Sequence, residues 1–208
     1  MWCGPPSGSS HLAFGSQTDE PGSVLGDLEG LADTGLVAVT AQGRIDLSAV
    51  ASVLGEVSIP ERALRGGLVL EGAIRAALLV ENLGAFCDLP ALDGWLIVHV
   101  PGWDTATVAL LLERLAAVPV IQFGDLDPNG VRIVRHLRAL RPDMHWFVPD
   151  FWWDLIDKHG QTRAWPDDLD VSDCPVLVKV LAERGLWLEQ EPLVVDPRLA
   201  DALWAAIT

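Results

Sequence analysis

Tyrosine is absent from this sequence of 208 residues, although tryptophan occurs nine times and phenylalanine five times. A chain without tyrosine cannot form a tyrosyl-DNA ester, so that kind of covalent strand cleavage is excluded. Cysteine is scarce, because Cys3, Cys87 and Cys174 stand singly with no CxxC spacing. This pattern argues against a structural zinc site and against a disulfide framework.

Basic residues are few as well. The chain has 14 Lys and Arg against 29 Asp and Glu, which gives a formal net charge of −15 at pH 7. Proteins that bind nucleic acid unaided usually carry an excess of positive charge, which neutralises the phosphates. Any role on DNA would therefore need metal ions or a basic partner.

Long hydrophobic runs and targeting signals are also missing. Apolar runs such as residues 76–80 and 95–100 are much shorter than the roughly 20 residues of a membrane span. The first ten residues lack a basic region and a continuous apolar stretch, which argues against a secretory signal. We expect no transmembrane helix and a cytoplasmic location.

The apolar content is nevertheless high, at 50% hydrophobic residues and a mean hydropathy of +0.30. A chain of this length and composition can bury the core of one main domain. Residues 1–23 are rich in Gly, Ser and Pro and are predicted to be a flexible tail with no assigned function.

Residues 24–67 are predicted to form a small N-terminal unit. A hairpin with its turn at Gln42-Gly43 is followed by a helix that Ser48 could cap and that runs through Leu54. The unit is interpreted as a degenerate winged helix, a docking element or an extension packed on the main domain. Gly66-Gly67 marks its boundary.

Beyond this boundary, residues 68–208 alternate short apolar strands with helical stretches, which is typical of βα units around a mostly parallel sheet. The predicted fold is an α/β domain with helices flanking the sheet. Strand candidates are residues 76–80, 95–100, 118–123 and 145–148. Helix candidates are residues 105–117, 131–140, 176–184 and 197–207.

Acidic residues follow two of the predicted strands. Asp125 and Asp127 come after residues 118–123, and their side chains point the same way because residues alternate in an extended backbone. Glu81 follows the apolar run 76–80. Ligands of open α/β sheets collect outside the carboxyl ends of strands, so the three acids are predicted to share one site. A DxD pair alone is more often a solvated turn.

Three carboxylates in one site repel one another, and a hard divalent cation is the simplest relief. Carboxylate oxygens suit Mg²⁺ or Mn²⁺, so one of these ions is the predicted cofactor of Glu81, Asp125 and Asp127. Pro128 and Asn129 then start a turn, and Gly130 lets the chain enter a helix close to a bound group. The N-terminus of that helix favours an anion such as phosphate.

These residues resemble a known pattern. Glu81, followed by Asp125-Leu-Asp127 with Pro128 and Gly130, is similar to the two acidic motifs of Toprim domains. The narrower Asp-x-Asp-Pro-x-Gly form resembles the type IIB topoisomerase A subunit, the meiotic double-strand-break proteins and the JetD nuclease subunits of Wadjet plasmid-defence systems. The absence of tyrosine separates this chain from the first two groups.

The JetD-like pattern fits best at three places. These are Val80-Glu-Asn82 with Phe86 and Leu89-Pro90, then residues 123–130 with Leu137 and Arg138, and finally residues 184–191. The resemblance covers residues 74–195 and leaves residues 1–70 unmatched. It implies a Toprim, Rossmann-like domain with C-terminal helices.

The resemblance implies metal-dependent hydrolysis of a DNA phosphodiester. One or two Mg²⁺ held by Glu81, Asp125 and Asp127 would activate a water and stabilise charge on the phosphate. Glu81 as a general base is an alternative, because that role is assigned to some Toprim glutamates. The implied partners are an SMC-kleisin-type complex, DNA and a second copy of the chain in a homodimer.

Further residues are candidates for smaller roles. Glu189 is a possible second-metal ligand, although solvated charge is the plainer interpretation, and Glu191 is interpreted as structural. Candidates for contact with phosphate or DNA are Asn129, Gly130, Arg132, Arg135 and Gly102. A solvated helix face explains the two arginines equally well. His99, His145, His159 and the aromatic run 151–153 are interpreted as structural.

Two other functions stay open from the sequence. The first is a catalytically weak Toprim module that serves as an assembly or regulatory subunit, which the charge of −15 favours and the intact acidic triad opposes. The second is a Toprim enzyme that acts on RNA or nucleotides.

Overall fold

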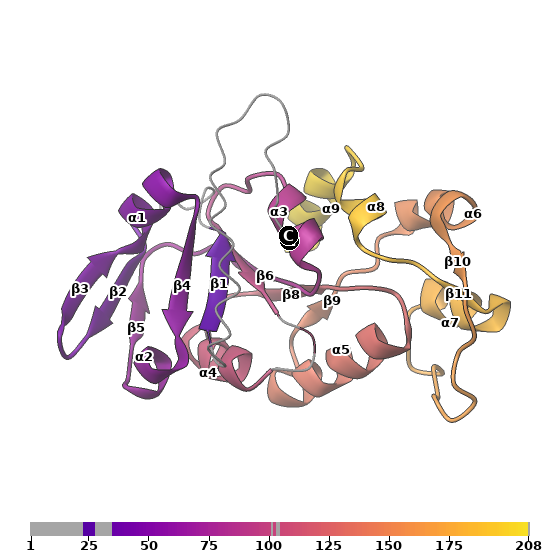
Figure 1. Ribbon diagram of the computed structural model, residues 1–208, viewed down its shortest axis with the longest axis horizontal. Coiled ribbons are helices and arrows are strands. Elements are labelled where there is room, and N and C mark those ends of the chain that lie inside the picture. Colours follow the sequence, from indigo (N-terminus) through magenta and orange to yellow (C-terminus); the bar gives the residue numbers. More distant parts are fainter. Residues whose placement is uncertain (1–22, 28–34, 101, 103–104, 208) are drawn as a thin grey trace.

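The computed structural model describes residues 23–27, 35–100, 102 and 105–207, and Figure 1 shows their arrangement. The tail predicted for residues 1–23 lies outside this range except for Ser23. The described part contains a six-stranded sheet, a three-stranded sheet and a two-stranded ribbon. Together with the helices that flank the largest sheet, this confirms the α/β class expected from the sequence.

The six-stranded sheet has the order β4-β1-β7-β6-β8-β9. Its strands are β4 (Glu56–Pro60), β1 (Ser23–Asp27), β7 (Trp95–His99), β6 (Ala76–Val80), β8 (Val120–Phe123) and β9 (His145–Trp146). Strands β7, β6, β8 and β9 run parallel, whereas β1 lies antiparallel between β4 and β7. The four parallel strands are those that the apolar runs predict.

Three of these strands are shorter than predicted, and β7 differs only by ending at His99 rather than Val100. β8 begins at Val120 rather than Val118, because Pro119 lacks an N–H and contributes only its carbonyl, which accepts from Ala77. β9 ends at Trp146 rather than Val148. Pro149 follows and caps the next helical turn, so the extended pairing stops early.

The strand order reverses between β6 and β8. β6 leads through α3 (Leu83–Asp88) to β7 on one side, and β7 leads through α4 (Ala106–Arg114) to β8 on the other side of β6. In open α/β sheets, ligands bind outside the carboxyl ends of the strands at such a switch point. The fold therefore predicts a ligand site at the ends of β6 and β8, which Glu81 and Asp125 follow.

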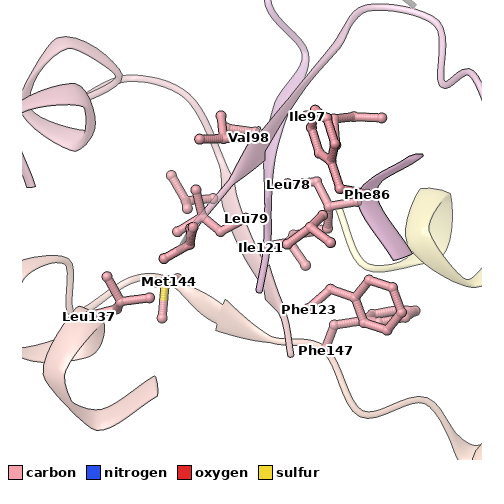
Figure 2. Packing of buried hydrophobic residues seen from close by; sticks show 14 of the residues in the cluster. Leu78, Leu79, Phe86, Ile97, Val98, Ile121, Phe123, Leu137, Met144 and Phe147 are labelled. Carbon is pink, nitrogen blue, oxygen red and sulfur yellow. The ribbon is translucent and has the colours of Figure 1, made fainter. Parts of the chain in front are cut away.

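Helices cover both faces of this sheet. Figure 1 shows α3, α8 (Glu191–Val194) and α9 (Leu199–Ala205) above it, and α4 and α5 (Pro128–Leu140) below it. Figure 2 shows Leu78 on the side of Phe86 from α3, and Leu79 on the side of Leu137 from α5. All five residues of β6 are fully buried, as expected for a parallel strand between two helical layers.

Helix bounds differ from the predicted ones mainly at the ends. α5 begins at Pro128 rather than residue 131, because Asp127 caps it and proline is well suited to the first helical turn. The helix predicted for residues 197–207 is α9, which covers only Leu199–Ala205 because residues 197–198 and 206–207 form turns. Leu140, the last residue of α5, is 47% exposed.

The N-terminal unit contains the predicted hairpin and helix. Its sheet has the order β3-β2-β5, with β3 (Gly43–Asp46), β2 (Val37–Thr40) and β5 (Val69–Glu71). The helices are α1 (Leu47–Leu54) and α2 (Glu61–Arg65). β5 lies past Gly67 and pairs with β2, while β4 leaves the unit to pair with β1. The small unit and the main sheet are therefore interleaved along the chain.

The capping residue of α1 is Asp46, and the prediction of Ser48 is wrong. The Asp46 carboxylate accepts a hydrogen bond from the Ala49 N–H at 2.9 Å, three residues into the helix. Ser48 is already inside the helix and is buried, and its Oγ accepts from the Leu36 N–H at 2.8 Å. The serine thus joins α1 to the residue directly before β2.

The chain between β9 and α8 forms a small lobe at the end of the molecule that Figure 1 shows on the right. Its elements are η2 (Asp150–Leu155), α6 (Ile156–His159), β10 (Gln161–Thr162), α7 (Val176–Arg184) and β11 (Leu186–Trp187). β10 and β11 pair antiparallel. Trp152 is fully buried against Phe123 and Phe147, whereas Trp153 is 39% exposed. In the described chain, no helix is both long and apolar enough to cross a membrane.

Arg141 joins the ends of α4 and α5. Its guanidinium donates to the carbonyls of Leu115 at 3.0 Å and Val118 at 2.9 Å, and also to those of Leu112 and Ala116. The arginine side chain is only 11% exposed. Carbonyls at and just past the end of a helix lack the regular helical donors, and this arginine supplies a donor to four of them.

We expect Arg141→Ala to lower the free energy of unfolding by roughly 3 kcal/mol, because several partly buried carbonyls lose their donor. Arg141→Lys should recover only part of the loss, since an ammonium cannot reproduce the planar fork. Urea denaturation measures both. The control is Arg44→Ala, which breaks an ion pair with Glu71 whose two side chains are 59% and 51% exposed. That change should cost less than about 1 kcal/mol, and an equal loss in the two alanine variants would contradict this role.

Candidate functional site

Glu81 and Asp125 meet where the hydrogen-bonded ladder between β6 and β8 ends. The last paired residues are Val80 and Phe123, and the Glu81 N–H donates to the Phe123 carbonyl at 3.3 Å. Glu81 directly follows β6, and Asp125 stands two residues beyond Phe123. The structure therefore places both acids at the switch point of the sheet.

The Glu81 side chain is held in a position that is unfavourable for a charged carboxylate. It accepts a hydrogen bond from the Asp125 backbone N–H, but its Oε2 is buried and has no hydrogen-bond partner among the described residues. Burial, together with the negative charges of Asp125 and Asp127, raises the pKa of Glu81 to about 8. Glu81 is thus the least satisfied acid of the three.

Asp125 shares this environment. Burial raises the pKa of Asp125 to about 7, although the Gln190 N–H, which donates to Oδ1 at 2.8 Å, opposes the change. The charges of Asp127, Glu191 and Glu189 raise the pKa as well. Five acidic side chains are therefore electrostatically coupled at one edge of the sheet.

Asp127 plays a structural part that the sequence did not indicate. Its Oδ1 accepts from the Gly130 N–H at 2.7 Å and caps α5, and the residue is only 8% exposed. Gly130 is required here, because a Cβ at this position would lie 2.0 Å from the Asp125 carbonyl oxygen. The loop 125–130 is consequently closed tightly on itself.

His99 lies beside Glu81 at the end of β7, where residue 99 pairs with residue 80. Its ring donates to the Glu81 backbone, and burial lowers the pKa of the imidazole. The ring also packs against Phe86 with the centroids 5.8 Å apart. These contacts fit the structural role expected for His99, and they place it next to the acids.

A segment distant in sequence closes the site. Residues 186–191, which we call the closing segment, run alongside the loop 125–130, where the backbones of Leu126 and Leu188 exchange hydrogen bonds of 2.8 and 3.2 Å. Gln190 is fully buried in this segment and contacts the ends of both β6 and β8. The sequence indicates the segment by its resemblance to the JetD pattern, but it does not single out Gln190.

Asn82 connects the closing segment to α3. Its side-chain oxygen accepts from the N–H groups of Gly84 and Ala85, which caps the helix, and its Nδ2 donates to Glu191 at 2.7 Å. Its backbone N–H donates to Gln190. The Glu-Asn pair after β6 is thereby explained, since the glutamate belongs to the acidic cluster and the asparagine orders the backbone beside it.

Glu189 faces a cation rather than the centre of the cluster. Arg163 lies 3.7 Å from its carboxylate, and both side chains are partly exposed. The Arg163 guanidinium also rests over the Trp187 ring, 4.9 Å from its centroid. Arg163 follows β10. The sequence does not single it out, because no nearby residue along the chain connects it to the acids.

The residues predicted to contact phosphate lie in different surroundings. Asn129 is exposed at the start of α5, while the Gly130 N–H is already used by Asp127. Gly102 follows β7 at the same edge of the sheet as the acids. Arg132 is partly exposed on α5, whereas Arg135 is paired with Asp173 and donates to the Asp170 carbonyl.

Divalent cations suit the chemistry of this cluster, although its side chains are not arranged around a common point. In the part of the chain that the structure describes, no three His, Cys, Asp or Glu side chains stand as a ready metal-binding group. Asp125 and Asp127 each direct an oxygen at a backbone N–H. A cation shared by all three acids therefore requires rotation of these side chains. The buried Oε2 of Glu81 and the carboxylate oxygens nevertheless fit a hard divalent cation.

A comparison with family models identifies the chain. The model described as "Wadjet protein JetD, C-terminal" matches residues 35–197, which is more than three quarters of the chain. The chain belongs to this JetD C-terminal family. A search of curated proteins found no match.

Membership in the JetD C-terminal family supports involvement in a Wadjet defence system and implies a complex with the other Wadjet proteins, which are SMC-like. The match begins at Gly35, so it includes the three-stranded N-terminal sheet, for which the sequence offered no counterpart. It ends just past the closing segment. The three-stranded sheet, every strand of the six-stranded sheet except β1, the acids and the closing segment all lie within the matched residues.

Proposed function

We propose that this JetD-family chain is a metal-dependent nuclease of Toprim type, and that Glu81, Asp125 and Asp127 hold Mg²⁺ or Mn²⁺. The observation that carries the proposal is the buried Oε2 of Glu81, which lies without a hydrogen-bond partner among the described residues and beside two further carboxylates. A buried carboxylate oxygen of this kind is costly unless a proton or a cation satisfies it.

The residues of the chain supply distinct parts of the chemistry. A bound divalent ion lowers the pKa of a water and stabilises charge on the attacked phosphate. Glu81, with a pKa of about 8, must lose its proton before it can ligate a cation or act as a general base, and the general-base role stays as an alternative to direct ligation. Asp127 fixes the turn into α5, and Gly130 keeps the loop free of side-chain bulk.

DNA must approach an acidic protein in this proposal. The net charge of −15 opposes phosphate, so we propose that a basic partner within the Wadjet complex delivers the DNA. Arg163 and Arg132 are the cations we assign to the phosphate, because Arg163 lies beside Glu189 and Arg132 is on the first turns of α5. A homodimer is part of the same proposal and rests on the resemblance to relatives alone.

A second function is favoured by a specific observation. Among the described side chains no metal-binding group of three is already assembled, and the whole chain is strongly acidic. Both features suit a JetD-family module that serves as an assembly or regulatory subunit without its own cleavage activity. The two functions differ in whether the acids are needed for a metal-dependent reaction.

Plasmid nicking separates the two functions. Wild-type chain, with the other Wadjet proteins present, is expected to nick supercoiled DNA with Mg²⁺ or Mn²⁺, and Asp125→Ala should lower the rate at least about 100-fold. Asp168→Ala is the matched control, because it removes an exposed acid outside the site. Equal rates for wild type and Asp125→Ala would sink the nuclease proposal and favour the assembly role.

A further inference from the structure

Gln190 makes three hydrogen bonds that converge on the two acid-bearing strand ends. Its side-chain Oε1 accepts from the Asn82 N–H at 2.9 Å, next to Glu81. Its Nε2 donates to the carbonyl of Phe123 at 2.9 Å, at the end of β8. Its own backbone N–H donates to Asp125 Oδ1 at 2.8 Å. The residue is completely buried.

The two strand ends need such a connection. The regular ladder between β6 and β8 ends at Val80 and Phe123, and only the 3.3 Å bond from the Glu81 N–H extends it. Beyond that point the side chains of Glu81 and Asp125 repel each other, which tends to separate the strand ends. The side-chain amide of Gln190 bridges the two strand ends by bonding to Asn82 after β6 and to Phe123 at the end of β8.

Glutamine makes both side-chain bonds with one planar amide. The Asn82 N–H can only donate and the Phe123 carbonyl can only accept, so the bridging group must present an acceptor to one and a donor to the other. A carboxylate lacks the donor, methionine lacks both strong groups, and asparagine is one methylene shorter. The two backbone partners also fix which way the amide is turned.

We infer that Gln190 is the positioning residue of the proposed metal site: it sets the separation of the ends of β6 and β8 and aims Asp125. This inference rests on the proposed function. The Asp125 oxygen that accepts from the Gln190 N–H is held while the carboxylate keeps a second oxygen for a cation. Residues that hold and orient ligand carboxylates typically change metal affinity 10- to 100-fold when they are replaced.

The test compares Mg²⁺ dissociation constants, measured by calorimetry on the full chain, for wild type and Gln190→Met. Methionine keeps the volume and the backbone N–H that donates to Asp125, but it loses both side-chain bonds that hold the two strand ends. Because the strand ends carry Glu81 and Asp125, we expect affinity to fall at least about 10-fold. Ser48→Ala is the matched control, because it removes a buried side-chain acceptor in the N-terminal unit. It should lower the free energy of unfolding and leave the Mg²⁺ dissociation constant unchanged.

Each outcome has a distinct meaning. Unchanged affinity in Gln190→Met, with clear binding by wild type, overturns the positioning role and leaves the metal site standing. No binding by wild type overturns the proposed metal site, and the positioning role with it. If the methionine variant does not fold, Gln190→Asn replaces it, since the shorter amide can reach one partner at most. Wild-type affinity in that variant would overturn the inference equally.

Discussion

Glu81→Gln is expected to abolish metal-dependent nicking while making the metal-free chain more stable at pH 8. The proposed reaction loses a ligand or a base at the centre of the site, which should lower the rate at least about 100-fold. The gain in stability has a separate cause. Burial and two neighbouring acids disfavour the charged carboxylate of Glu81, and the substitution removes that charge. A residue that served folding alone would not lower the nicking rate and raise the stability when it is replaced.

The gain in stability of Glu81→Gln should grow as the pH rises. The pKa of Glu81 is about 8 in the folded chain and 4.5 in the unfolded one, so between these values the folded state holds a proton that the unfolded state has lost. Stability contributed by Glu81 therefore falls as pH rises from about 4.5 to about 8. Glu81→Gln removes the decline, so the variant should match wild type near pH 5 and exceed it at pH 8.

We expect a difference of roughly 2 kcal/mol at pH 8, or about 4–8 °C in Tm. Thermal melts in chelator at pH 5 and pH 8 measure it, with Glu113→Gln on the exposed face of α4 as the control. A Glu81→Gln variant that is less stable than wild type at pH 8 would contradict the account, because it would mean that the folded chain stabilises the charged carboxylate.

Gly130→Ala is expected to disrupt the acidic loop. The new Cβ would lie 2.0 Å from the Asp125 carbonyl oxygen, and that atom belongs to the backbone and cannot turn aside. The loop 125–130 must therefore move, which also disturbs the bond from the Gly130 N–H to Asp127. We expect a loss of about 3 kcal/mol or more in the free energy of unfolding and the loss of metal-dependent nicking.

Gly102→Ala is the matched control for this change. Gly102 lies at the same edge of the sheet with a φ of +54°, and no heavy atom of the described chain would come within 4 Å of its Cβ. Its substitution should cost only about 1 kcal/mol, through backbone strain. Urea denaturation of the two variants and wild type decides the matter, and a similar small loss in both would show that the loop tolerates a side chain.

The parts of the fold that could be predicted are those that depend on residues close together in the sequence. The run Ala76–Val80 is apolar without interruption, and the strand has those bounds because both of its faces are covered. Strand-terminal acids could likewise be found, since parallel strands bring their carboxyl ends to one edge. The bounds of α7 (Val176–Arg184) follow from Pro175 before it and Gly185 after it.

The parts that were missed depend on contacts between distant segments. Gln190 bonds to Asn82 and Phe123 across more than 60 positions, and nothing near it in the chain indicates those partners. Arg163 is connected to the acids only through Glu189. Ser48 was predicted as a cap because serine favours that position, but Ser48 is the second residue of α1, where its Oγ accepts from the Leu36 N–H, and the capping residue is Asp46.

The most direct test of the metal site is calorimetric titration of Mg²⁺ into the full chain at pH 7, repeated in two buffers that differ in ionisation enthalpy. The account predicts saturable binding with release of protons, because Glu81 and Asp125, with pKa values of about 8 and 7, must give up protons to a cation. Asp125→Asn should abolish both the binding and the proton release. Saturable binding that persists unchanged in that variant, or no binding by wild type, would contradict the account.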